Sequence, residues 1–233
     1  MYTIFEYLNT LNLFSLFLLF LIENVFIAVS AVVIGFAFDG LLKQLKQLVS
    51  IKELCWGIST VLLNTVVTFS GYLLYKYHYI QIELGFSVLR VIVHFILLFV
   101  AMDFLMYVFH YIAHKFLFLN QFHELHHEYS TPTAFSLFVL HPIEVIGFGS
   151  IWLMLLYLGN FSIYAVMIYL ILNVIMGMIG HLRKEFIPEY IKNNTVFKWT
   201  ANTGFHVGHH QNDRYNFGFY TKIWDRLFGT LKD

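Results

Sequence analysis

Long apolar runs alternate with short polar segments along most of the chain. The runs cover roughly residues 10–38, 54–75, 86–109, 134–158 and 161–181. Apolar runs longer than about 18 residues are typical of helices that cross a membrane. Residues 183–233 are polar and aromatic and contain no such run. The pattern predicts an all-α integral membrane helical bundle with four to five transmembrane helices, in a single domain over residues 1–233.

The composition supports a membrane protein and excludes several other classes. Hydrophobic residues make up 59% of the chain and charged residues 12%, whereas soluble domains average about 25% charged residues. The formal net charge is zero, so no basic field indicates binding to nucleic acid. Cys55 is the single cysteine, which excludes an intrachain disulfide and a cysteine-ligated iron–sulfur or zinc site.

The positions of the basic residues predict the orientation in the membrane. If all five runs cross, only Lys76 and Arg90 of the 14 Lys and Arg residues lie on the side of the N-terminus. The others, including Lys43 and Lys46, lie on the opposite side, which is therefore the cytoplasmic side. The same threading brings every clustered histidine to this side. We expect a histidine-rich helical cap there, in a bacterial inner membrane rather than the endoplasmic reticulum.

Eight of the twelve histidines form three clusters near the ends of apolar runs, and a ninth stands alone at the end of another run. Two of the clusters repeat a spacing of i, i+3 and i+4, and a third has i and i+4, so each cluster lies on one helix face. The nine are His110 and His114 in HYIAH, His123, His126 and His127 in HELHH, His206, His209 and His210 in HVGHH, and the isolated His181. A single metal ion uses three or four protein ligands, so nine imidazoles predict two ions with open positions.

The remaining histidines are expected to have structural roles. His78 lies in a loop on the far side and His94 lies inside a run. His141, in HPIE, is expected to be a local or supporting group whose imidazole bonds a nearby carboxylate such as Glu144. These three residues are therefore left out of the predicted ligand set.

The stretch HELHH also satisfies the zinc peptidase signature H-E-x-x-H, with Glu124 as general base. That alternative needs His123, His127 and one further ligand, and it leaves most of the other clustered histidines without a role. A metal transporter is a second alternative, but transport sites normally include polar residues near the middle of the membrane. A non-catalytic protein that binds metal for structural purposes remains open.

Several motifs together resemble the fatty acid hydroxylase superfamily, which includes sterol desaturases and sterol methyl oxidases. They are the order HxxxH, HxxHH, HxxHH, and the stretches DFLMYVFHYIAH, HELHHEYSTPTAF, HPIE and FHVGHHQNDRYNFGFYTKIWDRLFGT. The resemblance covers roughly residues 100–230, the histidine-box region. It implies a membrane-bound non-haem di-iron oxygenase that uses O₂ and two electrons to hydroxylate or desaturate a lipid.

The resemblance also implies cofactors and partners. The eight histidines of HYIAH, HELHH and HVGHH match the metal ligands of the family, and His181 matches a further histidine between the second and third boxes. A tenth ligand has no counterpart in this sequence. The cofactors are expected to be two Fe ions, which zinc can replace in a purified protein. The lipid substrate is expected to come from the bilayer and the electrons from a separate ferredoxin, rubredoxin or cytochrome b5-type donor.

Other polar and aromatic residues are candidates for supporting roles. Asp103, seven residues before His110, is the candidate catalytic residue, because its carboxylate could orient an imidazole ring. Asp213 and Asp225 are further candidates for this task. The aromatic tail, RYNFGFYTKIWDRLFGT at residues 214–230, is expected to anchor at the membrane interface, to cap the metals, or both. The residues expected to anchor it are Tyr215, Phe217, Tyr220 and Trp224. The candidates for lining a lipid site are Tyr129, Phe135, Phe138 and Phe205.

Overall fold

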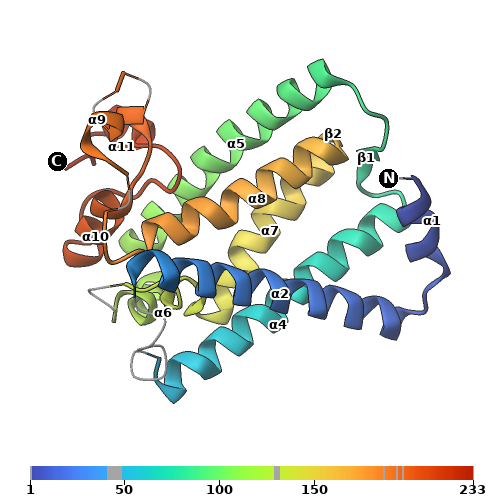
Figure 1. Cartoon of the computed structure of the whole chain (residues 1–233), viewed down its shortest axis with the longest axis horizontal. Coiled ribbons are helices and arrows are strands. Elements are labelled where there is room, and N and C mark those ends of the chain that lie inside the picture. The colour runs from blue at the N-terminus through green and yellow to red at the C-terminus, as the bar shows by residue number, and fades with distance from the viewer. Residues whose placement is uncertain are drawn as a thin grey trace.

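The computed structural model shows a bundle of long helices with a cap of short helices at one end (Figure 1). The structure describes residues 2–40, 49–128, 132–185, 187–192, 194–195 and 197–232. The long helices are α2 (Leu13–Asp39), α4 (Ile51–Lys76), α5 (Val88–Lys115), α7 (Pro142–Leu158) and α8 (Ile163–Gly180). The short elements are α1 (Tyr2–Thr10), α6 (Leu117–His127), α9 (Glu189–Lys192), α10 (Thr203–Gln211), α11 (Ile223–Phe228), the strands β1 (Gln81–Glu83) and β2 (Asn160–Ser162), and the 3-10 turns Ser136–Phe138 and Phe197–Trp199.

Among the residues that the structure describes, four helices are long and apolar enough to cross a membrane, which confirms the predicted all-α membrane bundle. They are α2, α4, α5 and α8, and α7 is a shorter apolar helix of 17 residues. The sequence pattern predicted one crossing helix over the apolar run 134–158. In the structure only Pro142–Leu158 of this run forms a long helix. Pro142 is the reason, because its ring cannot continue a helix from the preceding residues but fits at a helix start. His141 and Glu144 form a capping box at this start.

The helix ends alternate between two ends of the bundle, as a threading with five crossings requires. At the end far from the cap, β1 pairs in parallel with β2, and the Tyr72 hydroxyl lies 2.9 Å from the Asn9 side chain of α1. At the cap end, the Asp39 carboxylate at the end of α2 accepts hydrogen bonds from the backbone N–H groups of Arg183 and Lys184. Figure 1 shows β1 beside β2 at the end of the bundle opposite α10 and α11. Lys43 and Lys46, which contribute to the predicted charge asymmetry, lie outside the described residues.

The main core lies between α5, α7 and α8, and the polar tail reaches into it. Its fully or almost fully buried members include Leu98, Met102, Ala165 and Tyr169 of the helices and Tyr220 of the tail. The many exposed apolar side chains lie instead on the outer faces of the helices, where a bilayer would cover them. The tail is thus part of the core of the bundle.

Candidate metal centre

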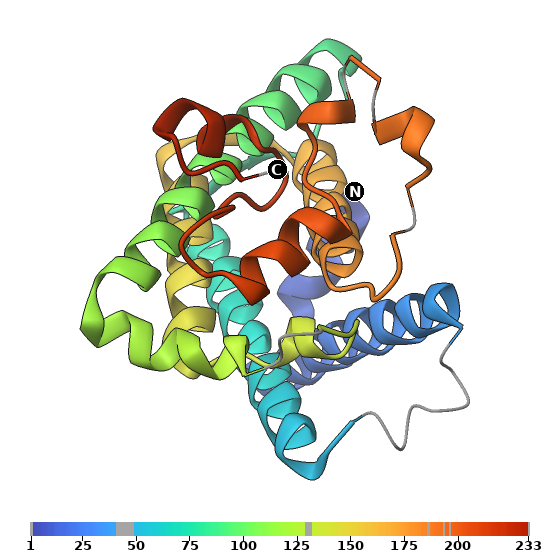
Figure 2. The ribbon, with the colours of Figure 1, turned by 90° about the vertical axis from the view of Figure 1, so that its left-hand side faces the viewer.

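The cap brings all nine predicted ligands together in two groups. The first group contains His110, His114, His123, His127 and His209, and the second contains His126, His181, His206 and His210. Within each group, one nitrogen from every ring lies within 4.8 Å of the others. The view from the cap end shows α6 below the end of α5 and α10 to the right of that end (Figure 2). The two groups do not coincide with the clusters in the sequence, because α6 and α10 each contribute histidines to both groups.

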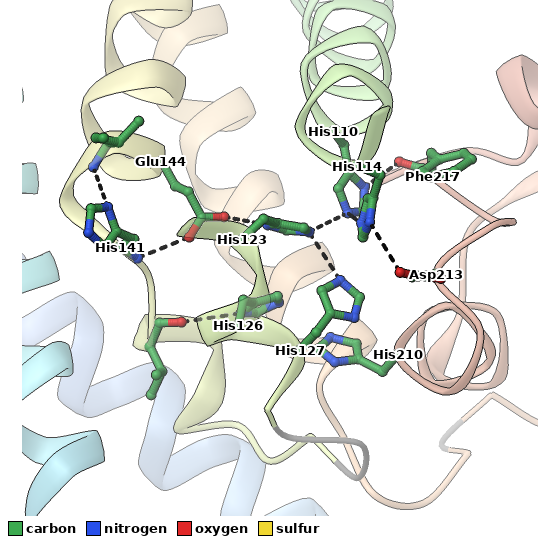
Figure 3. Close-up of polar contacts among 12 residues, drawn as sticks. His110, His114, His123, His126, His127, His141, Glu144, His210, Asp213 and Phe217 are labelled. Carbon is green, nitrogen blue, oxygen red and sulfur yellow. Dashed lines mark hydrogen bonds and ion pairs between the residues drawn. The ribbon is translucent and has the colours of Figure 1, made fainter. Parts of the chain in front are cut away.

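A break after α5 creates this arrangement. Phe116 adopts an extended conformation, with φ −97° and ψ 115°, so α6 leaves the axis of α5. His123 and His127 then face His110 and His114, while the neighbouring His126 points to the end of α8 (Figure 3). On α10, the side chain of Asn202 caps the helix by accepting a hydrogen bond from the Phe205 N–H.

In the first group, several Nε2 atoms lie very close to one another. These atoms lie 3.0 Å apart for His110 and His123, 3.0 Å apart for His114 and His209, and 3.1 Å apart for His127 and His123. The Nδ1 of His110 donates to the carbonyl oxygen of Phe217, and the Nδ1 of His123 donates to the carboxylate of Glu144. Neutral imidazole carries one hydrogen, so both Nε2 atoms present lone pairs to each other.

The second group repeats this arrangement with different elements. The Nε2 atoms of His181 and His126 lie 3.3 Å apart, and those of His210 and His206 lie 3.2 Å apart. The Nδ1 of His181 donates to the carbonyl of Gly177, and the Nδ1 of His126 donates to that of Val139. Because a carbonyl can only accept, these two Nε2 atoms also face each other without a hydrogen between them.

These spacings fit a metal ion in each group. Two facing lone pairs repel unless a cation lies between them. Imidazole nitrogens bind first-row metals at about 2.1 Å, which places adjacent ligand nitrogens of one ion about 3.0 to 3.4 Å apart. The observed separations of 3.0 to 3.3 Å fall in this range. The donor set is purely imidazole, which suits iron and zinc alike.

Burial favours the neutral form that metal binding requires for several of these imidazoles. In the second group, burial and neighbouring imidazoles lower the pKa of His126 to about 4 and that of His181 to about 3. Burial lowers the pKa of His209, in the first group, to about 3, although its hydrogen bond to the Tyr215 carbonyl opposes the shift. The pKa of His206 lies well below its usual value for the same reason.

Glu144 joins the first group to the start of α7. One carboxylate oxygen accepts from the Nδ1 of His123 at 2.5 Å, and the other accepts from the backbone N–H of His141 at 3.0 Å (Figure 3). The sequence predicted a bond from the His141 imidazole to Glu144. The structure shows instead that the backbone N–H of His141 donates to Glu144, while the His141 Nδ1 accepts from the N–H of Ile143. The sequence did not reveal that Glu144 reaches His123. It also did not reveal that the carbonyls of Val139, Gly177 and Tyr215 accept hydrogen bonds from other imidazoles of the two groups. The short distance in sequence between HPIE and HELHH was the available signal for a contact between Glu144 and His123.

Asp103 and Asp225 bind residues of the tail and not the imidazole rings that they were expected to orient. Asp103 accepts hydrogen bonds from the backbone of Tyr220, from the backbone and hydroxyl of Thr221 and from the indole of Trp224. The expected bond from an imidazole to Asp103 is not among the contacts of the described residues, because the tail saturates the carboxylate. Asp225 accepts from the N–H of Phe217, whose carbonyl binds His110.

Asp213 and the tail aromatic residues differ in how close they come to the site. The carboxylate of Asp213 lies 3.9 Å from the Nδ1 of His114. Phe217 and Tyr220 are buried, at 0% and 2% exposure, so they do not anchor the tail in the interface as expected. Tyr215 is 37% exposed.

The remaining residues singled out from the sequence are not members of the two groups. His94 accepts a hydrogen bond from the Ser162 N–H at the far end of the bundle, and His78 is an exposed residue with φ 64°. Phe135 and Phe138 pack against the buried cluster of Val32, Phe36 and Ala134. Phe205 is buried and has the Lys222 ammonium over its ring. Tyr129 lies outside the described residues.

The architecture and the site define the class: a membrane helical bundle with two adjoining groups of histidines, each able to hold a metal ion, in a cap at one end. The sequence profile of the Fatty acid hydroxylase family matches residues 95–230, more than half of the chain. The chain belongs to the fatty acid hydroxylase family. The matched region contains all nine histidines of the two groups.

Curated relatives are similar over the same region. The chain is 29% identical over 136 residues to very-long-chain aldehyde decarbonylase GL1-4 of Oryza sativa subsp. japonica, covering 55% of this chain and 22% of the relative. It is 28% identical over 188 residues to the Delta(7)-sterol 5(6)-desaturase of Eremothecium gossypii, covering 78% and 51%. Lathosterol oxidase of Mus musculus is 28% identical over 135 residues, covering 56% and 42%. The chain thus spans about a fifth to a half of these relatives, and no solved structure matches it.

Proposed function

We propose that this protein is a membrane-bound non-haem di-iron oxygenase that hydroxylates or desaturates a lipid with O₂. The observation that carries the proposal is the pair of imidazole groups, in each of which facing Nε2 lone pairs need a cation between them. The relatives named as sterol desaturase and lathosterol oxidase support the same reaction class. Iron ions bound to the two groups would supply the oxidising power for an unactivated C–H bond, which amino acid side chains lack.

The residues of the chain hold and orient the ligands. His110, His114, His123, His127 and His209 would bind one ion, and His126, His181, His206 and His210 the other. Carbonyl oxygens and Glu144 hold Nδ1 hydrogens, so that Nε2 carries the lone pair that faces the site. Asp103 and Asp225 hold the tail, and thereby the carbonyl of Phe217 against His110. We assign Asp103 this positioning role.

The substrate and the electrons come from outside the chain in this proposal. A lipid would enter from the bilayer, because the helices around the site present apolar side chains outward. A separate ferredoxin, rubredoxin or cytochrome b5-type protein would deliver electrons at the cap, on the cytoplasmic side. Lys115, Arg214 and Lys232 are exposed near the first group and would attract an acidic donor.

The zinc peptidase alternative finds no support in the position of Glu124. This residue is exposed, and its carboxylate accepts a hydrogen bond from Asn120 on the same helix. A general base must reach the water on the metal. Its two histidines, His123 and His127, belong instead to a group of five imidazoles.

Metal analysis combined with lipid mass spectrometry tests the proposal. The purified protein should contain two iron or zinc ions, and a strain that carries His126→Ala should lack an oxidised lipid species that the wild type makes. A deletion strain should show the same loss. An unchanged lipid profile in both strains, despite loss of metal from His126→Ala, would favour a non-catalytic metal site.

A further inference from the structure

A cavity with about 50 Å³ of free space lies beside the second histidine group. It is bounded by the last turns of α8, the 3-10 turn Ser136–Phe138 and the segment that leads into α10. His181 and His206 form part of its wall. Both rings belong to the second group, so whatever occupies the cavity lies next to that group.

The rest of the wall is mostly apolar and includes Leu137, Met176, Gly177 and Phe219. These residues are half-buried, and the cavity is partly open. Ile175, next to Met176 on α8, is 41% exposed on the outer face of the bundle. An apolar molecule in the bilayer thus has a short way to the cavity along α8.

The first group lacks this access on the side of the tail. The ring of Phe217 is fully buried and lies 5.4 Å from the ring of His114 and 5.5 Å from that of His209. Phe219 packs on His110, with 5.0 Å between ring centroids, and so separates the cavity from the first group. The two groups therefore differ, because aromatic rings cover the first while the second adjoins an apolar cavity.

The size of the cavity limits what can enter. A water-sized group needs roughly 10 to 15 Å³ of such space, so about 50 Å³ accommodates a few methylene groups. A fused ring system would not fit without rearrangement of the wall. We propose that this cavity receives an unbranched alkyl segment of the lipid substrate and presents its carbon to the second histidine group. The inference rests on the proposed function and adds to it the substrate class and the group at which the carbon lies.

Gly177 is the residue that sets the width of the cavity. A Cβ atom at this position would lie 2.9 Å from Cδ1 of Leu137, so an alanine there would narrow the space or displace Leu137. The carbonyl of Gly177 holds the Nδ1 of His181, and a substitution of the side chain keeps this carbonyl. Gly177→Ala thus changes the cavity while it leaves the ligand and its hydrogen bond in place.

Photolabelling of the full-length, metal-loaded protein tests the inference. A fatty acid with a diazirine near its methyl end should label Leu137, Met176 or Phe219, and a diazirine-bearing sterol should not. In Gly177→Ala this labelling should fall about tenfold, the effect of one methyl group in an apolar pocket, with both metal ions retained. Gly85→Ala is the matched control, since a Cβ there meets nothing within 4 Å, and it should label like the wild type.

Three outcomes would overturn the inference. They are fatty-acid labels confined to outward residues of α8 such as Ile168 and Ile171, stronger labelling of the cavity by the sterol, or equal labelling in Gly177→Ala and wild type. The oxygenase proposal fails separately: labelling of the cavity by a protein that oxidises no lipid in cells would support the binding site and contradict the reaction.

Discussion

The carboxylate of Glu144 on α7 accepts a hydrogen bond from Nδ1 of His123 on α6, with 2.5 Å between the two atoms. The same carboxylate caps α7 through the backbone N–H of His141. One side chain therefore sets both the start of α7 and the direction of an imidazole in the first group. Such a partner fixes the tautomer of a metal ligand and raises its basicity.

Replacement of Glu144 by glutamine should weaken metal binding while the bundle still folds. A glutamine side chain has one acceptor oxygen, so it cannot serve His123 and His141 together. We expect the affinity for metal to fall about 10- to 100-fold, measured as ions retained per chain after dialysis against a graded chelator. Glu124→Gln, at an exposed position beside His123, should retain metal like the wild type. Equal retention by the two variants would contradict the role of Glu144.

Substitution of neighbouring histidines should remove different ions. His126 belongs to the second group and His127 to the first, although both lie on α6. Each Ala variant should keep about one ion per chain, because the other group retains its full ligand set. Spectroscopy of an iron- or cobalt-loaded sample should then give two different single-site spectra. Identical spectra, or complete loss of metal from both variants, would show that the groups do not bind independently.

Asp103→Asn should loosen the tail. The carboxylate accepts four hydrogen bonds from Tyr220, Thr221 and Trp224, and an asparagine amide would turn its own hydrogens toward some of these donors. A buried donor left without a partner costs about 1 to 3 kcal/mol. Hydrogen–deuterium exchange in residues 203–230 should rise, and metal should be lost more easily. Glu83→Gln, in an exposed ion pair at the far end, is the control. Unchanged exchange in Asp103→Asn would show that Asp103 does not hold the tail.

The apolar pattern was sufficient to predict the membrane bundle, and the histidine spacing was sufficient to identify eight of the nine candidate ligands. The isolated His181 was identified by its position at the end of an apolar run and by the family resemblance. The division of the ligands could not be predicted, because His126 and His127 separate only through the packing of α6 against α5 and α8. The acceptors for Nδ1 were also hidden, since every residue carries a carbonyl and only the fold selects Phe217 or Gly177. The late start of α7 had a visible signal in Pro142, which the apolar run outweighed.

The tail shows the same limit for a charged residue. Asp103 lies inside an apolar run, and its cost in a membrane predicted a polar partner. Because Asp103 and His110 are seven residues apart, about two turns of a helix, the sequence indicated that Asp103 orients the imidazole of His110. The partner lies over a hundred residues away in the sequence, because Tyr220 and Thr221 insert beside α5. A periodic pattern carries no information about such a contact.

Activity with a purified donor should depend on salt, if an acidic redox protein docks near the first group. Lys115 lies over the rings of Tyr111 and Phe217, and Phe217 contacts imidazoles of that group. Lys115→Glu should raise the KM for the donor and reduce the salt dependence, because attraction between exposed charges is screened within about 10 Å at 0.1 M salt. Reduction by dithionite should be unaffected. Lys76→Glu at the opposite end is the control, and a salt-independent rate in the wild type would exclude electrostatic docking.

Acid should destabilise the metal-free protein more steeply than its exposed groups would allow. The pKa of His126 is lowered to about 4 in the folded protein, against 6.5 as the ordinary value. Below pH 6.5 the unfolded chain takes up a proton that the folded chain does not, so the free energy of unfolding falls as the pH drops toward 4. At about pH 5 the loss is on the order of 2 kcal/mol for this one imidazole, and His181 and His209, with pKa values of about 3, add to it.

Thermal unfolding of the chelator-treated protein in detergent measures this effect. The melting temperature should hold above about pH 6.5 and decline steadily below it. His78→Asn is the control, because His78 is exposed and Asn tolerates its positive φ, so the curve should match that of the wild type. His181→Asn should decline less steeply, since it removes one of the groups that must charge. A melting temperature independent of pH down to about 4.5 would mean that the imidazoles are already solvated without metal, and that the close Nε2 contacts form only when ions are bound.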